Sequence, residues 1–506
     1  MDEPTIPSNA DELVQRLILV PENKRLEFKR ASNKMVSKAL ETICAFANAE
    51  GGVLVIGLAD LKEHQGSGRL FGTEENAEAV DELRRKLRSE IQPVLDGLRF
   101  YSLPCRLAGG PRSGEPGHLL WIQVPKSADV HSLVNGGTFT RLDAGNRHMD
   151  AGEINELSFR RGKLSATGAP VDVDLALLQG SAWVRYAGAR GPLTGTFEDQ
   201  LLRLGLAVRL EGKVQPRMAA VLLFAEEPGS LLAVLGHRAD IRLLVYDGKE
   251  IIPGAKPNLR KPQKSIRGPI IDQIQRAVGH VLDELSQGLT LSGSGFKTVH
   301  SYPERVVKEA IVNAVLHRDY RLNRDVFIRI FDDRIEVESP GVLPGSITPN
   351  NIDRMGSHAR NQLLAQNLRE FPTPPNLDAG EGVRMMFAEM SQANLYPPQY
   401  RENTETAVET VTVTLLNHQR PSAWDQVSDW LDRHGFIANQ DVCRIAKLDT
   451  LKASKLLTGW RDKGLLVQVP GRARRNMAYM KPTGGTFDPS LLSSLEDNND
   501  EDSENT

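Results

Sequence analysis

Apolar and polar side chains alternate along residues 26–29, Leu-Glu-Phe-Lys, which is the period of a β-strand with its apolar face in a core. From residue 35 to 49 the apolar positions recur every three or four residues, which predicts a helix. The residues expected on its buried face are Met35, Leu40, Ile43, Cys44 and Ala47. Two glycines end this helix, and the apolar run 53–57 predicts a central strand. The chain therefore begins with a strand, a helix and a second strand.

Further along, apolar runs separated by turn residues predict more strands and helices. The Gly- and Pro-rich segment 109–117 is expected to be a hairpin loop between strands at 98–103 and 118–124. The later expected strands are 219–224, 241–246, 326–331 and 334–339. The expected helices are 270–285 and one in which Pro303 takes the favoured first position.

From residue 422 to 482 the pattern changes to three short helices and two short strands, which together describe a winged helix. The expected helices are 424–433, 439–446 and 450–463, and the expected strands are 465–469 and 477–480. From residue 496 the chain carries acidic side chains and no apolar ones, so this tail is expected to be disordered.

These elements predict an α/β fold class with several domains (α+β multidomain). The length of 506 residues exceeds what one hydrophobic core organises, which also favours several domains. The expected segments are 1–162, an α/β middle unit at 171–300, an α/β unit at 301–416, the winged helix at 421–482 and the acidic tail at 483–506. Residues 165–170, Ser-Ala-Thr-Gly-Ala-Pro, are expected to be a linker after the first segment.

Composition limits the class of protein. The formal net charge of -3 leaves a nucleic-acid partner open, because charges that cancel over the chain can still segregate locally. The three cysteines lie far apart and suggest neither a zinc site nor a secreted disulfide framework. The N-terminus lacks an apolar signal segment, and no run approaches the roughly twenty apolar residues of a membrane span. A cytoplasmic protein without a membrane partner is expected.

Acidic residues surround the first strand. Glu27 and Lys29 share the side of residues 26–29 that does not face the core, Glu22 precedes this strand, and Asp60 follows the second strand. Metal-dependent cleavage of a phosphodiester uses two or three carboxylates that hold a divalent ion, together with a cation near the phosphate. Glu22, Glu27 and Asp60 would hold Mg²⁺ or Mn²⁺, and Lys29 would be the cation. The alternative interpretation is a solvated sheet face with an ion pair between strands.

The motifs Glu27-Phe-Lys, Ala45-Phe-Ala-Asn-Ala-Glu-Gly-Gly52 and Val55-Ile-Gly-Leu-Ala-Asp60 resemble the AlbA-like domain of Schlafen proteins. Val124-Pro-Lys-Ser127 and Thr138-Phe-Thr-Arg141 fit the same resemblance. The resemblance covers about the first 160 residues and implies nucleic-acid binding. In those relatives that cleave RNA, it implies a carboxylate triad at the positions of Glu22, Glu27 and Asp60.

In the third segment, Glu309, Asn313 and His317 are spaced four residues apart and line one stripe of a helix. A carboxylate and an amide stacked in this way can orient water and bind magnesium beside a triphosphate. The alternative interpretation is a stripe that faces solvent.

The context of that stripe resembles a divergent GHKL-type ATPase domain, an α/β sandwich. The resemblance rests on residues 309–320, 333–341, 357–364 and 380–382. It implies ATP binding, with Glu309 as the base that orients water and Asn313 as the magnesium ligand. Gly341, Gly380 and Gly382 would let the backbone approach the nucleotide. The chain departs from the family at Glu338-Ser-Pro-Gly341, where ordinary members carry an aspartate and two close glycines, so the resemblance supports ATP binding more strongly than it supports adenine recognition or hydrolysis.

The expected winged helix has a local excess of positive charge. Residues 422–482 contain eleven Lys or Arg and six Asp, and such an excess attracts phosphate. The side chains expected to contact nucleic acid are Lys452 and Lys455 on the third helix and Arg472, Arg474 and Arg475 in the wing turn. The alternative is a winged helix that mediates protein contacts.

Two functions remain from the sequence. The first is an ATP-responsive protein that binds RNA or DNA and is a Mg²⁺- or Mn²⁺-dependent nuclease of the Schlafen type, with RNA as the favoured substrate. The second is a non-catalytic transcriptional regulator, which binds DNA through the winged helix while its other domains sense nucleotide or form a homo-oligomer.

Overall fold

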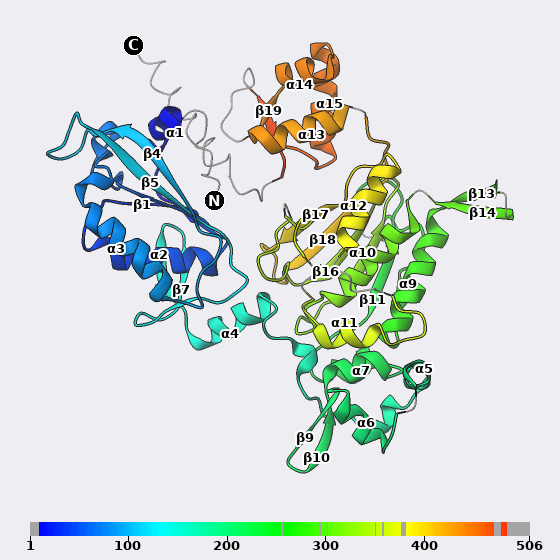
Figure 1. Cartoon of the computed structure of the whole chain (residues 1–506). Helices are drawn as coiled ribbons and strands as arrows, with labels where there is room; N and C mark the ends of the chain where they lie inside the picture. The colour runs from blue at the N-terminus through cyan, green and yellow to red at the C-terminus, as the bar shows by residue number, and fades with distance from the viewer. Residues whose placement is uncertain are drawn as a thin grey trace. The chain divides into compact units, whose positions relative to one another are not determined.

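The computed structural model describes residues 10–191, 193–254, 257–292, 295–300, 302–349, 351–356, 359–375, 381–421, 423–469 and 477–482 (Figure 1). The chain divides into two compact units, residues 1–158 together with 422–506, and residues 159–421. Both units contain helices and strands, so the predicted α/β (α+β multidomain) class is confirmed. Among the helices in these ranges, none is long and apolar enough to cross a membrane.

The N-terminal part of the first unit is built on a four-stranded sheet in the order β1-β2-β5-β4. These strands are β1 (Leu26–Lys29), β2 (Gly52–Ile56), β5 (Pro116–Val124) and β4 (Arg99–Arg106). The parallel strands β1 and β2 are joined by α2 (Met35–Asn48), whereas β5 is antiparallel to both β2 and β4. The predicted strand–helix–strand unit and the hairpin are therefore confirmed.

Separate apolar clusters cover the two faces of this sheet. Residues of α2 and α3 (Ala77–Ser89) form one of them, and the five inward positions predicted for the helix are all buried. Residues of α1 (Ala10–Leu17) pack on the other face with Leu26 and Phe28. Because side chains alternate along a strand, Glu27 and Lys29 belong to the α2 side.

Short paired strands and a helix complete this part of the first unit. They are β3 (Ile91–Gln92) with β6 (Ser132–Leu133), β7 (Phe139–Leu142) with β8 (Gly145–His148), and α4 (Ala151–Arg160). β7 packs against α2 and brings Arg141 to Glu27, which is only 5% exposed. The interpretation of this strand face as solvated is therefore wrong for Glu27, because a segment distant in sequence covers it.

In the C-terminal part of the first unit, the described residues form three helices and three short strands. They are α13 (Ala423–His434), β19 (Ile437–Ala438), α14 (Asn439–Ala446), α15 (Thr450–Asp462), β20 (Val467–Gln468) and β21 (Ala478–Met480). The strands pair in the order β19-β21-β20, and the buried rings of Trp424 and Trp460 meet edge to face at 5.1 Å. The predicted wing turn and the acidic tail lie outside the described residues.

The second unit is organised by a six-stranded sheet in the order β12-β11-β15-β16-β18-β17. The strands are β12 (Lys264–Ile266), β11 (Ile241–Val245), β15 (Val326–Ile330), β16 (Arg334–Pro340), β18 (Thr410–Leu416) and β17 (Gln399–Asn403). β11 and β15 are parallel, and every other neighbouring pair is antiparallel.

Helices cover one face of this sheet. They include α9 (Ile270–Leu285), α10 (Glu304–Leu316) and α12 (Gly382–Gln392), and α10 packs against both of the others. One apolar core joins these helices to β11, β15, β16 and β18. Strands predicted in the middle segment and in the third segment therefore share a sheet and a core, and residue 300 lies within this unit.

Smaller elements precede or flank the sheet. They are α5 (Ser181–Arg190), α6 (Phe197–Arg203), β9 (Ala207–Leu210), β10 (Lys213–Pro216), α7 (Met218–Phe224), α8 (Pro228–Ala233), β13 (Ser286–Ser292), β14 (Gly295–His300) and α11 (Gln362–Leu368). β9 pairs with β10 and β13 pairs with β14, each pair antiparallel.

The prediction of a strand at 219–224 is wrong, because this run belongs to α7. Every residue of α7 is buried, so all its faces are apolar and periodicity cannot distinguish a helix from a buried strand.

The segment 165–170, predicted as a linker, is packed within the second unit. Thr167 is fully buried, and Ser165 Oγ donates to Asn361 Oδ1 at 2.8 Å.

Candidate functional site

A cavity of about 360 Å³ lies between α10, α12 and the sheet of the second unit. Glu309, Asn313 and His317, the predicted stripe of α10, all line it. Gly341 and Gly382 line it as well, whereas Gly380 lies outside the described residues. The stripe therefore faces a cavity, and four of the five residues predicted to contact a nucleotide surround the same space.

Glu309 and Asn313 are in direct contact within this cavity. Asn313 Nδ2 donates a hydrogen bond to Glu309 Oε1 at 3.0 Å, as the spacing of four residues allows. Burial raises the pKa of Glu309, although the hydrogen bond from Asn313 and the charges of Lys308 and Arg305 oppose the shift. A carboxylate with a raised pKa beside an amide is a suitable acceptor for a proton from water.

Gly382 begins α12 directly against this carboxylate. A Cβ atom at position 382 would lie 1.8 Å from Glu309 Oε1, so a larger residue would displace the Glu309 side chain. The glycine therefore allows the first turn of α12 to close one side of the cavity.

Gly341 has a different role in the opposite wall. Its φ of +111° is disfavoured for residues with a side chain, and a Cβ there would lie 3.1 Å from the Cβ of Asp319. Its N–H donates to the carbonyl of Glu409 at 2.8 Å. The chain can thus turn sharply after β16 and form the wall that includes Val342 and Leu343.

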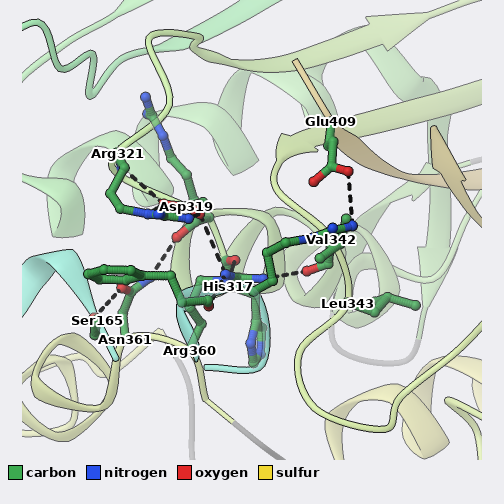
Figure 2. A network of polar contacts seen from close by, with 12 residues as sticks. Ser165, His317, Asp319, Arg321, Val342, Leu343, Arg360, Asn361 and Glu409 are labelled. Atoms are coloured by element: carbon green, nitrogen blue, oxygen red, sulfur yellow. Dashed lines mark hydrogen bonds and ion pairs between the residues drawn. The ribbon is translucent and has the colours of Figure 1, made fainter. Parts of the chain in front are cut away.

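A buried guanidinium holds that wall in place, as Figure 2 shows. Arg360 donates from Nε to the carbonyl of His317 at 3.0 Å and from Nη2 to the carbonyl of Val342 at 2.5 Å. Its Nη1 donates to the carbonyl of Phe159 at 2.9 Å and lies 3.6 Å from Asp319 Oδ2. The end of α10, the wall and the start of the second unit are therefore fixed by one side chain.

Asn361 extends this support (Figure 2). Its Nδ2 donates to the carbonyls of Leu316 and Arg318 at 2.8 Å each. Arg360 and Asn361 belong to the motif 357–364, but the sequence of that motif indicates no role for either. An adjacent Arg-Asn pair ahead of an apolar helix was the available signal, but the partners could not be read from it.

Glu338 belongs to the segment in which the chain departs from the ATPase family pattern. Side chains alternate between the two faces of β16, and this places Glu338 on the face away from the cavity. Its carboxylate pairs with Arg324 at 2.6 Å and with Arg329 at 2.9 Å. Burial would raise the pKa of Glu338, but the two guanidinium groups outweigh it and the pKa is lowered. The cavity instead presents Ser339, whose Oγ donates to the carbonyl of Ala314 at 2.6 Å.

The rest of the cavity offers both apolar and polar surface. An apolar cluster on one side is suited to a flat heterocyclic ring. The cavity residues of this cluster are Leu343, Ile347, Ile352, Val383, Tyr400 and Val411. Magnesium beside a triphosphate needs only one or two protein ligands, because phosphates and water complete its shell. The Oδ1 atom of Asn313 fits that requirement, since Nδ2 is the atom that contacts Glu309.

In the first unit, three of the four predicted catalytic residues lie close enough to the fourth, Glu22, to affect its ionisation. The charges of Glu27, Lys29 and Asp60 all act on Glu22, whose pKa is raised by burial and then by Glu27. The structure therefore brings together the residues that the sequence grouped.

Four of the six oxygens of these carboxylates accept a hydrogen bond. Glu27 Oε2 accepts from Arg141 Nη2 at 2.6 Å, and Glu27 Oε1 accepts from Lys29 Nζ. Glu22 Oε1 accepts from the Phe28 N–H at 2.9 Å, and Asp60 Oδ1 accepts from the Lys62 N–H at 3.1 Å. Within the described part of the chain, no three His, Cys, Asp or Glu side chains are arranged to hold a metal ion. This donor set does not fit the predicted Mg²⁺ or Mn²⁺ centre.

Of the predicted nucleic-acid contacts, Lys452 and Lys455 are exposed on α15. Asp449 caps this helix through the N–H of Lys452 at 2.8 Å, and its carboxylate lies 3.2 Å from Lys452 Nζ. Arg472, Arg474 and Arg475 lie outside the described residues.

Two family models match parts of the chain. The model described as Schlafen, AlbA_2 matches residues 22–150. The model described as putative ATP-dependent DNA helicase recG C-terminal matches residues 323–415. The chain therefore carries a Schlafen AlbA-like domain followed by a GHKL-like ATPase-type domain, as the sequence motifs predicted. The second match begins after α10, so Glu309 and Asn313 lie outside it and meet it at the cavity.

Among solved structures, the chain is similar to the DIP2311 protein from Corynebacterium diphtheriae. The two are 20% identical, the similarity covers 96% of this chain and 98% of that one, and the TM-score is 0.39. A TM-score this low does not establish a shared fold. No curated protein matches the chain significantly. The two domains together suggest a function in ATP binding and in nucleic-acid chemistry.

Proposed function

We propose that this protein is an ATP-responsive nucleic-acid-binding regulator. The observation that carries the proposal is the convergence of Glu309, Asn313, Gly341 and Gly382 on one cavity of about 360 Å³. A cavity of this size with an apolar side and a few convergent polar groups is typical of a small-molecule site. Asn313 would hold the magnesium ion that neutralises the phosphates of ATP, and Glu309 would orient water near them.

Nucleic-acid binding is assigned to two regions of the first unit. The Schlafen AlbA-like match supports the N-terminal region. In the C-terminal region, three helices with strands in the order β19-β21-β20 are interpreted as a winged helix. Exposed Lys452 and Lys455 near the start of α15 are in a position to contact phosphate.

The regulator is favoured over the metal-dependent nuclease. A nuclease of that kind needs carboxylate oxygens available to a divalent ion, and both oxygens of Glu27 are bound by cationic side chains. The expected response to ATP is therefore a change in nucleic-acid affinity, without strand cleavage.

Nucleotide binding is tested by calorimetric titration of the full chain with ATP and Mg²⁺. Replacing Asn313 by alanine removes the proposed magnesium ligand and a hydrogen bond to Glu309, so ATP affinity should fall by about tenfold or more. The matched control is Asn323→Ala, an exposed asparagine in the same unit that does not line the cavity. Equal and negligible heats for the wild type and both variants would refute the nucleotide site.

Nucleic-acid binding is tested by measuring affinity for duplex DNA and for tRNA over a range of salt concentrations. The Lys452→Gln, Lys455→Gln double variant should bind more weakly and should reduce the slope of log affinity against log salt by about two. Lys213→Gln, an exposed lysine of the second unit, is the control.

The same mixtures decide whether the protein cleaves nucleic acid. Incubation with tRNA, single-stranded DNA and duplex DNA, with and without Mg²⁺ or Mn²⁺, should leave every strand intact. Cleavage that requires metal and disappears in Glu27→Ala and Asp60→Ala would support the nuclease instead.

A further inference from the structure

Arg141 is a buried cation within the acidic cluster of the first unit. Its side chain is 1% exposed, and its Nη2 donates to Glu27 Oε2 at 2.6 Å. The same nitrogen donates to the carbonyl of Asn23 at 2.9 Å. Arg141 ends the motif 138–141, and the sequence alone indicates no function for it.

The position of this guanidinium is fixed on several sides. Its Nη1 donates to Asn146 Oδ1 at 2.8 Å, and Asn146 Nδ2 donates in turn to Thr42 Oγ1 on α2 at 2.9 Å. The ring of Phe46, also on α2, lies 4.8 Å from the guanidinium carbon. Neighbours on α2 and β8 therefore hold the guanidinium of Arg141 beside Glu27, which distinguishes it from a flexible side chain on the surface.

The charges around Arg141 are balanced. The cluster contains three carboxylates, because the charges of Glu27 and Asp60 both act on Glu22. Three cationic side chains oppose them, because Arg141 and Lys29 bond to Glu27, and Arg69 is within electrostatic range of Glu22 and Asp60. A divalent ion is attracted by uncompensated carboxylate oxygens, and this cluster offers little net negative charge.

We infer that Arg141 is a built-in cation that occupies the place of a divalent metal ion at this cluster. Its guanidinium supplies the positive charge that the carboxylates would otherwise take from Mg²⁺ or Mn²⁺. The first unit consequently does not bind a divalent metal ion at Glu27. The inference concerns the first unit alone and is independent of whether the cavity of the second unit binds ATP.

The test is a titration of the nucleotide-free full chain with MnCl2, followed by calorimetry and by the electron paramagnetic resonance signal of free Mn²⁺. The wild type and the single variant Glu27→Gln should give the same Mn²⁺ titration. Arg141→Gln frees Glu27 Oε2 and leaves the cluster with excess negative charge. It should therefore bind Mn²⁺ at least about tenfold more tightly than the wild type, and adding Glu27→Gln should abolish the gain.

Arg141→Lys is the matched control, because it keeps the positive charge and should titrate as the wild type does. Circular dichroism establishes which variants are folded. A folded Arg141→Gln variant that gains no Mn²⁺ affinity would overturn the inference. If Arg141→Gln does not fold, the wild type and Glu27→Gln decide: equal titrations support the inference, and wild-type Mn²⁺ binding that Glu27→Gln removes overturns it.

Discussion

At the scale of single residues, the cavity of the second unit depends on two positions at which only glycine fits. Gly382 allows α12 to begin against Glu309, and Gly341 adopts a φ of +111° where the wall turns. Between them, Glu309 is placed where burial raises its pKa. The carboxylate that is proposed to orient water is therefore also a site at which protein stability depends on pH.

Replacing Glu309 by glutamine tests this. A carboxyl whose pKa is raised on folding contributes stability that is present at low pH and is lost as the pH rises through the folded pKa. Glutamine cannot ionise and can still accept the hydrogen bond from Asn313. The Glu309→Gln variant should therefore have a higher free energy of unfolding than the wild type at pH 8, and the two free energies should become equal near pH 4. Urea denaturation at several pH values measures this, and a constant difference would contradict it.

The sequence located the residues of the cavity better than it located their support. Glu309 and Asn313 could be grouped because four residues make one turn of a helix. The partners of Arg360 could not, because it binds the carbonyls of His317, Val342 and Phe159. Backbone carbonyls are present at every residue, so no sequence pattern marks the three that Arg360 binds.

At the scale of elements, local pattern succeeded where one face of an element differs from the other. The helix at 35–49 was predicted because its apolar positions repeat, and its inward residues are buried. The run 219–224 is apolar at every position, which is also the pattern of a buried strand. It forms α7 instead, a helix that is buried on all sides. An element buried on all sides has no polar positions from which to measure a period.

The attachment of α2 to the strands beyond it is also testable. Asn48, which is buried, donates to the carbonyls of His131 and Phe139 at 2.8 Å and accepts from the His131 N–H at 2.8 Å. Asn48→Ala would leave these backbone groups buried without that partner and should cost about 3 kcal/mol. The exposed Asn33→Ala control should change stability by about 0.5 kcal/mol or less. Chemical denaturation monitored by circular dichroism measures both, and equal effects would argue against the role of Asn48.

At the scale of the whole molecule, the second unit is continuous across residue 300. β11 and β12 come before that position, and the four other strands of the sheet come after it. β11 pairs in parallel with β15, and parallel partners need a long connection, so they are distant in sequence. The sequence divided this unit in two because the connection contains its own helix and turns.

This continuity predicts how fragments will behave. A fragment of residues 159–421 should unfold in one cooperative thermal transition, because it contains the whole sheet and core. A fragment of residues 301–421 lacks β11 and α9, so it exposes the edge of β15 and part of the core, and it should aggregate or lack a cooperative transition. Calorimetry of the two fragments compares them. A cooperative transition in the shorter fragment would show that it is an independent domain.

The sequence by itself determined the class of fold, the two matched domains and four of the residues that line the cavity, Glu309, Asn313, Gly341 and Gly382. Helical spacing and short motifs are local properties, so they can be recognised in the sequence without knowledge of the fold. Only the tertiary structure decided that Arg141, 114 residues beyond Glu27, neutralises that carboxylate, and that α7 is a buried helix. Pairing between distant residues depends on how strands and helices pack, because packing brings into contact side chains that no local spacing relates.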